Sequence, residues 1–234
     1  MPRKRLPADE LRRDREAADE RQLDEPWRKN PAQSGYRLRL AGLRSSLAGP
    51  FDLSVEAGEC IAISGASGSG KSLFLRMIAD LDPAQGQAWL DGRPRAGFPA
   101  PEWRRQVVYN AAEPGWWSDQ VADHFSAVAA AFARGAAPRI GLAPELLDAQ
   151  VARLSTGERQ RLGLLRALAL DSPVLLLDEA TGALDEDSTA RVEAVLRERL
   201  EAGVAIVMVT HSPAQAERLG RRRFRMQDGG LVAA

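Results

Sequence analysis

A glycine-rich octapeptide between two apolar segments is the strongest constraint on the fold of this 234-residue chain. It runs from Gly65 to Ser72 and matches the phosphate-binding loop pattern G-x-x-x-x-G-K-[ST]. The apolar run at residues 60–63 predicts a strand before the loop, and residues 71–80 predict a helix after it. A strand, a glycine loop and a helix in this order place free backbone amides around an anion. An ordinary Gly/Ser loop would not explain both flanking elements.

The loop supplies both a cation and a hydroxyl for a nucleotide. Lys71 is one of only three lysines, although the chain has 32 basic residues. A compact ammonium fits between the β- and γ-phosphates, where the broad fork of arginine would not. We therefore predict that Lys71 bridges these phosphates of ATP and that the Ser72 hydroxyl binds Mg²⁺. The predicted nucleotide-binding residues of the loop are Gly65, Ser67, Gly68, Ser69, Gly70, Lys71 and Ser72.

Two adjacent acids, Asp178 and Glu179, directly follow the apolar run at residues 174–177. Carboxylates at the end of a buried strand are costly unless cations or hydrogen bonds compensate. We predict that Asp178 holds Mg²⁺ through water. We predict that Glu179 is the general base that polarises the attacking water, an effect worth roughly 10²–10⁴-fold. The alternative is a strand that ends in two solvated acids.

Two further segments offer groups to an anion. Ser155 and Gly157 open a predicted helix at residues 156–170, where a hydroxyl and free amides are available. Taken alone, this segment is typical of an ordinary helix N-cap. His211 follows the apolar run at residues 204–209, and the only other histidine is His124, for which a structural role is expected.

The order of these motifs resembles the nucleotide-binding subunit of an ABC transporter, over roughly residues 36–230. The resemblance implies that Ser155 and Gly157 reach the γ-phosphate bound to a second subunit, so that the ATP-bound state is a homodimer. It implies that residues 183–185 cross the dimer interface and that His211 contacts the γ-phosphate. Thr156 and Glu158 depart from the usual Leu-Ser-Gly-Gly-Gln. The catalytic residues expected from motif and resemblance together are Glu179, His211 and Lys71.

Two residues expected in this family are missing. The family places a glutamine that binds Mg²⁺ and water after the strand that corresponds to residues 107–109, and alignment puts Ala112 there. Asn110 or Glu113 could replace it with some shift of the loop. The substitution puts the hydrolysis rate, metal binding and coupling to a membrane subunit in doubt, and leaves nucleotide binding intact. The family also often stacks adenine on an aromatic residue, and residues 42–47 contain none.

Three tryptophans lie near this loop in the sequence: Trp103, Trp116 and Trp117. The cassettes of this family receive a helix of the membrane subunit in this region, and aromatic residues suit such an anchor. Packing in the protein core is the alternative.

The alternation of predicted strands and helices predicts an α/β fold with a mainly parallel sheet and flanking helices. The resemblance makes it a P-loop NTPase with an ABC-type core, an antiparallel β lobe and a small helical lobe at about residues 115–170. We expect a charged tail over residues 1–34 and one domain over residues 35–234. Further predictions are helices at 119–133 and 144–153, a strand at 105–110 and a buried, unreactive Cys60.

Composition narrows the alternatives. The formal net charge is zero and the pI is about 6.8, so no global field attracts nucleic acid. No apolar stretch approaches the ~20 residues that span a bilayer. We therefore expect a cytoplasmic ATPase, held at the inner face of the membrane by a transmembrane permease subunit, with closest likeness to small bacterial exporters such as the iron-exporter group. The alternatives are an ATP-binding regulatory cassette with weak hydrolysis and an ABC protein of DNA repair or translation. The latter usually carries coiled-coil insertions or two cassettes, which this chain lacks.

Overall fold

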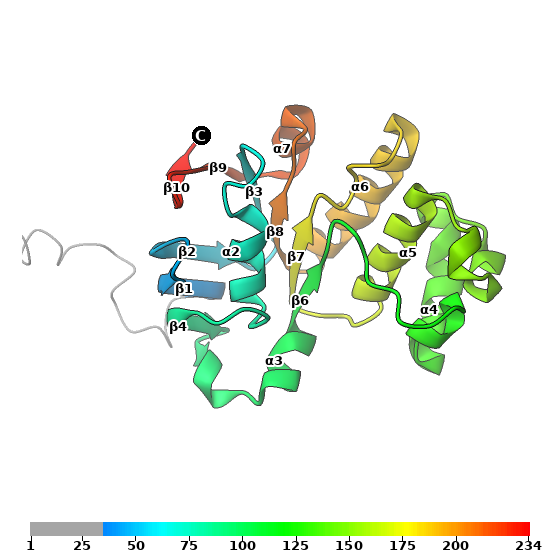
Figure 1. The fold of residues 1–234 in the computed structure, drawn as a ribbon, viewed down its shortest axis with the longest axis horizontal. Coiled ribbons are helices and arrows are strands. Elements are labelled where there is room, and N and C mark those ends of the chain that lie inside the picture. The colour runs from blue at the N-terminus through cyan, green and yellow to red at the C-terminus, as the bar shows by residue number, and fades with distance from the viewer. Residues whose placement is uncertain (1–34) are drawn as a thin grey trace, which may run out of the picture. The chain divides into compact units, whose positions relative to one another are not determined.

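The computed structural model describes residues 35–234, and the tail predicted over residues 1–34 lies outside them. The described chain forms two sheets with helices (Figure 1). The larger sheet has six strands in the order β10-β9-β3-β8-β7-β6, and the smaller has four in the order β2-β1-β4-β5. The predicted combination of a mainly parallel sheet and an antiparallel lobe is confirmed.

The six-stranded sheet is parallel except for its last strand, β10. Its strands are β3 (Cys60–Gly65), β6 (Val107–Asn110), β7 (Val174–Asp178), β8 (Ala205–Val209), β9 (Arg222–Gln227) and β10 (Gly230–Ala233). Every residue of β7 and β8 is buried, as expected for strands covered on both faces. Ile63, Val209 and Asp178 stand in register on neighbouring strands. The carboxyl ends of β3, β8 and β7 therefore meet at one edge.

The two faces of this sheet bury different partners because side chains alternate along a strand. Ile61 and Ile63 belong to the core that includes α2 (Lys71–Ile78) and the small sheet. Cys60 and Ala62 belong to the core that includes α5 (Thr156–Leu168) and α6 (Glu186–Glu201). Figure 1 shows α2 and α5 on opposite sides of strands β6, β7 and β8.

Cys60 lies in the second of these cores and is 2% exposed. Burial raises the pKa of its thiol to about 12, and the neighbouring charge of Glu59 adds to the rise. The thiol is therefore protonated at neutral pH, which agrees with the predicted unreactive role.

The four-stranded sheet is antiparallel throughout. It consists of β1 (Tyr36–Arg44), β2 (Phe51–Glu56), β4 (Gln85–Leu90) and β5 (Arg93–Pro94). Leu38 and Leu40 point into the core, and Phe51 packs on Phe74 of α2 with ring centroids 4.5 Å apart. This packing fixes the helix that follows the glycine loop.

The helical region differs from the prediction in two places. Residues 119–133 form no single helix, because Phe125 and Ser126 are extended and Ser126 caps a new helix through its Oγ. Residues 144–153 form two 3-10 turns, interrupted where Gln150 bridges to Gln120. The elements are η4 (Val121–His124), α4 (Ala127–Ala136), η5 (Ala137–Ile140), η6 (Pro144–Asp148) and η7 (Val151–Arg153).

The strand predicted at 105–110 begins only at Val107, because Arg105 and Gln106 end α3 (Ala100–Gln106), which follows η3 (Arg95–Gly97). Trp103 on α3 is fully buried and donates from its indole Nε1 to the Ile78 carbonyl at 2.9 Å. The sequence analysis also missed α7 (Pro213–Leu219), which is short and begins with proline. Within residues 35–234, no helix has both the length and the apolar character needed to cross a membrane.

Candidate nucleotide-binding and catalytic site

The glycine loop, the acid pair and His211 lie at the edge where β3, β8 and β7 end. Lys71 follows β3 after the glycine loop, Asp178 ends β7 and His211 lies two residues beyond β8. In open α/β sheets, ligands bind outside the carboxyl ends of such strands. Motifs that are more than 100 residues apart in the sequence are thus brought to one edge of the sheet.

The backbone of the glycine loop explains its glycines. Gly65 has φ +148°, and a Cβ there would lie 2.7 Å from the Met226 carbonyl oxygen. Gly70 has φ +98° and is the N-cap of α2. Gly68 also has a positive φ, of +75°. Because α2 begins at Lys71, its first amides are open to an anion, as the phosphate-loop prediction requires.

The Lys71 side chain lies inside the loop and is buried. Its Nζ donates to the carbonyl oxygens of Gly65 at 2.9 Å and Ala66 at 2.8 Å. These bonds hold the ammonium at the centre of the loop, where phosphate oxygens would replace the carbonyls as acceptors. Ser72, the next residue, is exposed, so its hydroxyl is accessible to a metal ion.

Asp178 is 3% exposed and has a partner that the sequence analysis missed. The hydroxyl of Tyr109 donates to Asp178 Oδ2 at 2.9 Å. Burial raises the pKa of Tyr109, and the Asp178 charge and this hydrogen bond add to the rise. Tyr109 therefore stays a neutral donor that orients the carboxylate. Its place in β6, on the same face as α2, was the available signal.

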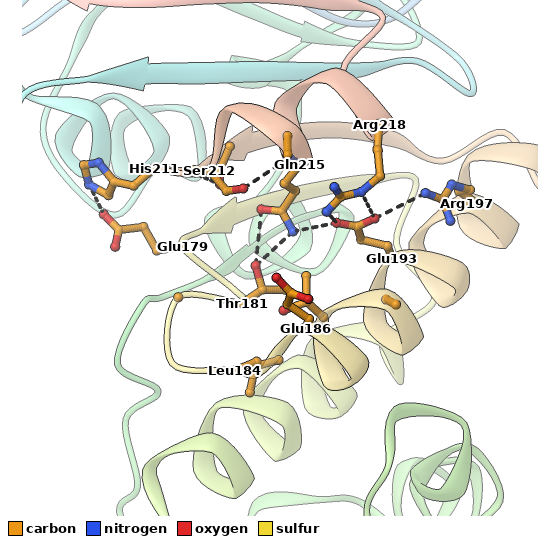
Figure 2. Close-up of a pocket in the computed structure, with 15 residues that line it drawn as sticks. Glu179, Thr181, Leu184, Glu186, Glu193, Arg197, His211, Ser212, Gln215 and Arg218 are labelled. Carbon is orange, nitrogen blue, oxygen red and sulfur yellow. Dashed lines mark hydrogen bonds and ion pairs between the residues drawn. The ribbon is translucent and has the colours of Figure 1, made fainter.

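Glu179 adopts a strained backbone conformation beside His211. Its φ of +48° is unusual for glutamate and costs about 1–3 kcal/mol, a kind of strain that clusters at active sites. Its amide donates to the Val209 carbonyl at 3.0 Å, which fixes the turn after β7. Glu179 Oε1 lies 2.8 Å from His211 Nε2, and both side chains reach solvent. Figure 2 shows the pair at the rim of a cavity of about 900 Å³.

Ser155 and Gly157 are placed at the start of α5. Ser155 Oγ accepts from the Glu158 amide at 3.3 Å, and Glu158 Oε2 accepts from the Ser155 amide at 2.8 Å. These bonds form a capping box, and the bonds from the Ser155 amide and hydroxyl lower the pKa of Glu158. Gly157 faces residues 183–184, with the Ala183 carbonyl oxygen 3.5 Å from where a Cβ would lie. Among residues 35–234, no hydrogen bond joins Ser155 or Gly157 to the glycine loop.

Gln160, one turn further along α5, is a second residue that the sequence analysis missed. Its side chain is buried and donates from Nε2 to the Glu179 carbonyl at 2.7 Å. The same nitrogen lies 3.4 Å from the Ala112 carbonyl, and Oε1 accepts from the Ala183 amide at 3.1 Å. One side chain therefore connects three segments of the site. A glutamine inside a helix carries no pattern that predicts such contacts.

The position of the missing glutamine is filled by a short, partly buried side chain, Ala112. Asn110 is 4% exposed and lies beside Gly163 of α5. Because residues alternate along β6, Asn110 points to the face opposite that of Tyr109. Asn110 is therefore poorly placed to act as the replacement, whereas Glu113 is exposed.

The three tryptophans divide between the two alternatives. Trp103 belongs to the core, so the anchor interpretation is wrong for it. Trp117 is 71% exposed, and Trp116 is partly buried. His124 holds their loop, because its Nε2 accepts from the Trp117 amide at 2.9 Å. Its structural role is as predicted. The Arg166 guanidinium lies over both rings, 5.1 and 5.0 Å from the centroids of Trp116 and Trp117.

The segment in which the family often places an aromatic residue for adenine lies close to the glycine loop in the structure. Residues 45–49 lie beside the glycine loop, with Ala48 Cβ 3.7 Å from where a Cβ on Gly70 would be. The Gly49 amide donates to the Gly229 carbonyl at 2.8 Å, which anchors this segment. Its exposed apolar residue is Leu47, at 80%.

The glycine loop, the acid pair and the histidine at one edge of a parallel sheet define a phosphate-loop nucleotide-binding protein. Comparison with known proteins specifies the family, because residues 49–182 match the model of the ABC transporter family. The hemin import ATP-binding protein HmuV of Streptomyces coelicolor is 36% identical over 221 residues, which are 86% of this chain and 76% of that protein. The chain therefore belongs to the ABC transporter family, as an ATP-binding cassette of the ABC ATPase type.

Two other comparisons set the extent of the similarity. Protein STAR1 of Oryza sativa subsp. japonica is 36% identical over 205 residues, which cover 80% of this chain but only 59% of that protein. The dimeric structure of MJ0796, a bacterial ABC transporter cassette, superposes with a TM-score of 0.71 and 23% identity. It matches 83% of this chain and 96% of that one, so the fold predicted from the motifs is confirmed.

Proposed function

We propose that this cassette hydrolyses ATP and that closure of two cassettes on ATP drives transport through a membrane subunit. The observation that carries the proposal is the meeting of three strand ends, which brings Lys71, Asp178 and His211 to one edge. A phosphate loop without a carboxylate and a histidine opposite it would support binding alone. The strained Glu179 beside His211 supplies the base that hydrolysis requires.

Each residue then has a chemical role. Lys71 and the first amides of α2 bind the β- and γ-phosphates. Glu179 orients the attacking water and accepts its proton, and His211 holds Glu179 and faces the γ-phosphate. Removing Glu179 as a base while keeping its shape leaves binding intact, so Glu179→Gln separates the two functions.

Ser72 and Asp178 are the residues that fit Mg²⁺. A hydroxyl and a carboxylate are hard oxygen ligands, and Mg²⁺ in nucleotide sites takes few protein ligands beside phosphates and water. Residues 35–234 contain no group of three or more His, Cys, Asp or Glu that could hold a metal ion by themselves. When bound, the ion would neutralise charge on the phosphates, and Tyr109 would keep the Asp178 carboxylate oriented toward it.

A second copy of the chain would complete the site. Ser155 and Gly157 offer anion-binding groups but have no hydrogen bond to the glycine loop among the described residues. In a head-to-tail dimer they would contact the γ-phosphate held by Lys71 of the partner. The similarity to a dimeric bacterial cassette structure supports this arrangement.

The membrane subunit would bind at residues 111–118. Trp117 is a large exposed aromatic side chain on a loop next to the catalytic segments, and such residues often anchor interfaces. We propose a transmembrane permease as the partner, which would hold the cassette at the inner face of the membrane. The transported substrate and its direction belong to that partner.

A regulatory cassette that binds ATP but hydrolyses it poorly is the second candidate, and Ala112 favours it. Replacing Ala112 by glutamine decides between the two. A large rate increase in the variant would favour the regulatory cassette, and an unchanged rate would favour the ATPase.

The first experiment is ATP hydrolysis as a function of protein concentration, with Glu179→Gln as the blank. A rate that rises faster than linearly and disappears in the blank supports a dimeric ATPase. No rate above the blank, with purified membrane subunit present, would contradict the proposal.

A further inference from the structure

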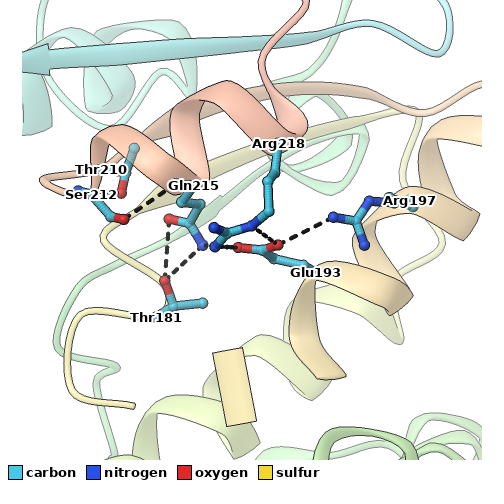
Figure 3. A network of polar contacts seen from close by, with 7 residues as sticks. All are labelled: Thr181, Glu193, Arg197, Thr210, Ser212, Gln215 and Arg218. Atoms are coloured by element: carbon cyan, nitrogen blue, oxygen red, sulfur yellow. Dashed lines mark hydrogen bonds and ion pairs between the residues drawn. The ribbon is translucent and has the colours of Figure 1, made fainter. Parts of the chain in front are cut away.

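An ionic network around one buried carboxylate, outside the phosphate motifs, connects α6 to α7 (Figure 3). Its centre is Glu193, whose side chain is 2% exposed. Arg218 donates to both carboxylate oxygens, at 2.8 and 2.7 Å, and Arg197 adds a bond of 3.2 Å. Burial opposes ionisation of Glu193, but these arginines lower the pKa of its carboxyl below the ordinary value. The charge is thus retained in a place where an unpaired carboxylate would be costly.

The network continues to the catalytic loop through Gln215, which is 2% exposed. Gln215 Nε2 donates to Thr181 Oγ1 at 2.9 Å, and the Thr181 hydroxyl lies 3.2 Å from Gln215 Oε1. Nε2 also lies 3.4 Å from Glu193 Oε1. Because only the nitrogen can donate to a carboxylate, Glu193 sets which way the amide of Gln215 points.

The Thr181–Gln215 contact joins the two loops that carry the catalytic pair. Thr181 is two residues after Glu179, and the next amide, of Gly182, donates to the Glu179 carbonyl at 2.9 Å. Gln215 is four residues after His211. Its backbone N–H donates to Ser212 Oγ at 3.2 Å, at the start of α7. The 2.8 Å contact between His211 and Glu179 therefore lies between two backbones that Gln215 ties together.

The backbone bond from the Glu179 amide to the Val209 carbonyl joins the two strand ends, and Gln215 adds a second connection beyond them. The cavity of about 900 Å³ lies between residues 179–184, α6 and the start of α7. Figure 2 shows Glu193 and Gln215 between the helices at this cavity, with Glu179 and His211 further along the rim. On the side of the cavity, Gln215 and Arg218 hold α7 through polar bonds, while Ala216 and Leu219 pack on the core.

We propose that Gln215, oriented by Glu193, is a positioning residue that sets the distance between His211 and Glu179. The inference rests on the proposed catalytic roles of those two residues. Gln215 touches neither of their side chains; it acts through Thr181 on one side and through the first turn of α7 on the other. Removing its amide leaves both catalytic groups present and changes only their separation.

The test compares Gln215→Leu and Thr181→Val, with Gln227→Leu on exposed β9 as the matched control. Both test variants remove the contact between Thr181 and Gln215 with little change in volume, and Gln215→Leu also removes the contact to Glu193. We expect Gln215→Leu and Thr181→Val each to lower kcat on the order of 10-fold with little change in KM, since small misplacement of reacting groups is costly. The control Gln227→Leu should keep the kcat of the parent chain. The double variant should be no slower than Gln215→Leu alone, because Gln215→Leu already removes the contact to Thr181. His211→Ala should cost less in the Gln215→Leu background than in the parent chain.

A spectroscopic measurement keeps the inference testable if hydrolysis itself is not observed. The chain has only two histidines, so their imidazole NMR signals can be assigned. The signals of His211 should shift in Gln215→Leu and in Thr181→Val, while those of His124 and of the Gln227→Leu control stay fixed. Unmoved His211 signals, or an equal cost of His211→Ala in both backgrounds, would overturn the inference. If the unsubstituted chain hydrolyses no ATP but the His211 signals still shift in the two variants, the result counts against the proposed function and leaves the positioning role of Gln215 supported.

Discussion

The corner around Glu179 and the loop at residues 111–118 are both attached to α5, yet they are held very differently. The corner is held by buried polar side chains, Gln160 and Gln215, with donors and acceptors satisfied within the chain. The loop has alanine at the expected polar position and exposes Trp117. Buried His124 holds the backbone of the loop, so the difference lies in what each region exposes: the corner keeps its polar groups inside, whereas the loop presents a large aromatic ring to solvent.

The largest expected effect on stability is at the ionic network of the corner. Glu193→Ala should destabilise the fold by about 3 kcal/mol, near the lower limit for a broken buried pair, because both arginines are half-exposed and can reach water. Chemical denaturation measures it. Since pairing lowers the pKa of Glu193, its contribution is present at neutral pH and is lost as pH falls through that lowered pKa. The difference between variant and parent should therefore shrink in acid, and a difference that does not depend on pH would contradict the charge pairing.

Loss of the buried ammonium should come next. Lys71→Ala should weaken ATP binding roughly 100-fold, as expected for a charge-assisted contact to phosphate. Isothermal titration with ATP in the Glu179→Gln background avoids turnover during the measurement. Lys29→Ala, outside the predicted motif, is the matched control. Unchanged ATP affinity in Lys71→Ala would exclude the phosphate-loop assignment.

A smaller effect should follow when the corner is separated from the loop. Gln160→Leu removes the bonds to the carbonyls of Glu179 and Ala112, and we expect kcat to fall about 10-fold with ATP affinity kept. Single-turnover hydrolysis measures it. A loss of ATP affinity equal to the loss of rate would show that Gln160 supports the fold and not the catalytic geometry.

The smallest effect should be on the loop. Trp117→Ser removes an exposed ring, so hydrolysis by the isolated cassette should stay within about twofold and stability within ~0.5 kcal/mol. Binding to the membrane subunit, measured by co-purification, should be lost. If Trp117→Ser lowered ATP hydrolysis by the isolated cassette as strongly as it lowered binding to the membrane subunit, Trp117 would belong to the catalytic structure. The contrast between the two regions would then be lost.

The sequence predicted the groups that follow apolar strands, because a strand that is buried on both faces has a clear signal and its carboxyl end has a fixed place. Asp178 and His211 were predicted in this way and Lys71 from the glycine-loop pattern, and the structure brings the three to one edge of the sheet. Tyr109 and Gln215 were missed, since a polar residue inside a strand or helix does not show that its partner is 69 or 34 residues away. The predicted helix at residues 119–133 was wrong in its bounds. The segment is rich in alanine and favours a continuous helix, but the Ser126 hydroxyl caps a new helix that begins at Ala127.

Cys60 should not react with thiol reagents while the chain is folded. It is the only cysteine, it is almost completely shielded, and its proton is held at neutral pH. A maleimide would therefore find no competing thiolate in the native fold. A cysteine introduced at an exposed position with no proposed role, such as Val128 of α4, would be labelled alone. A fluorophore there would report on α4 during turnover without removal of any native cysteine.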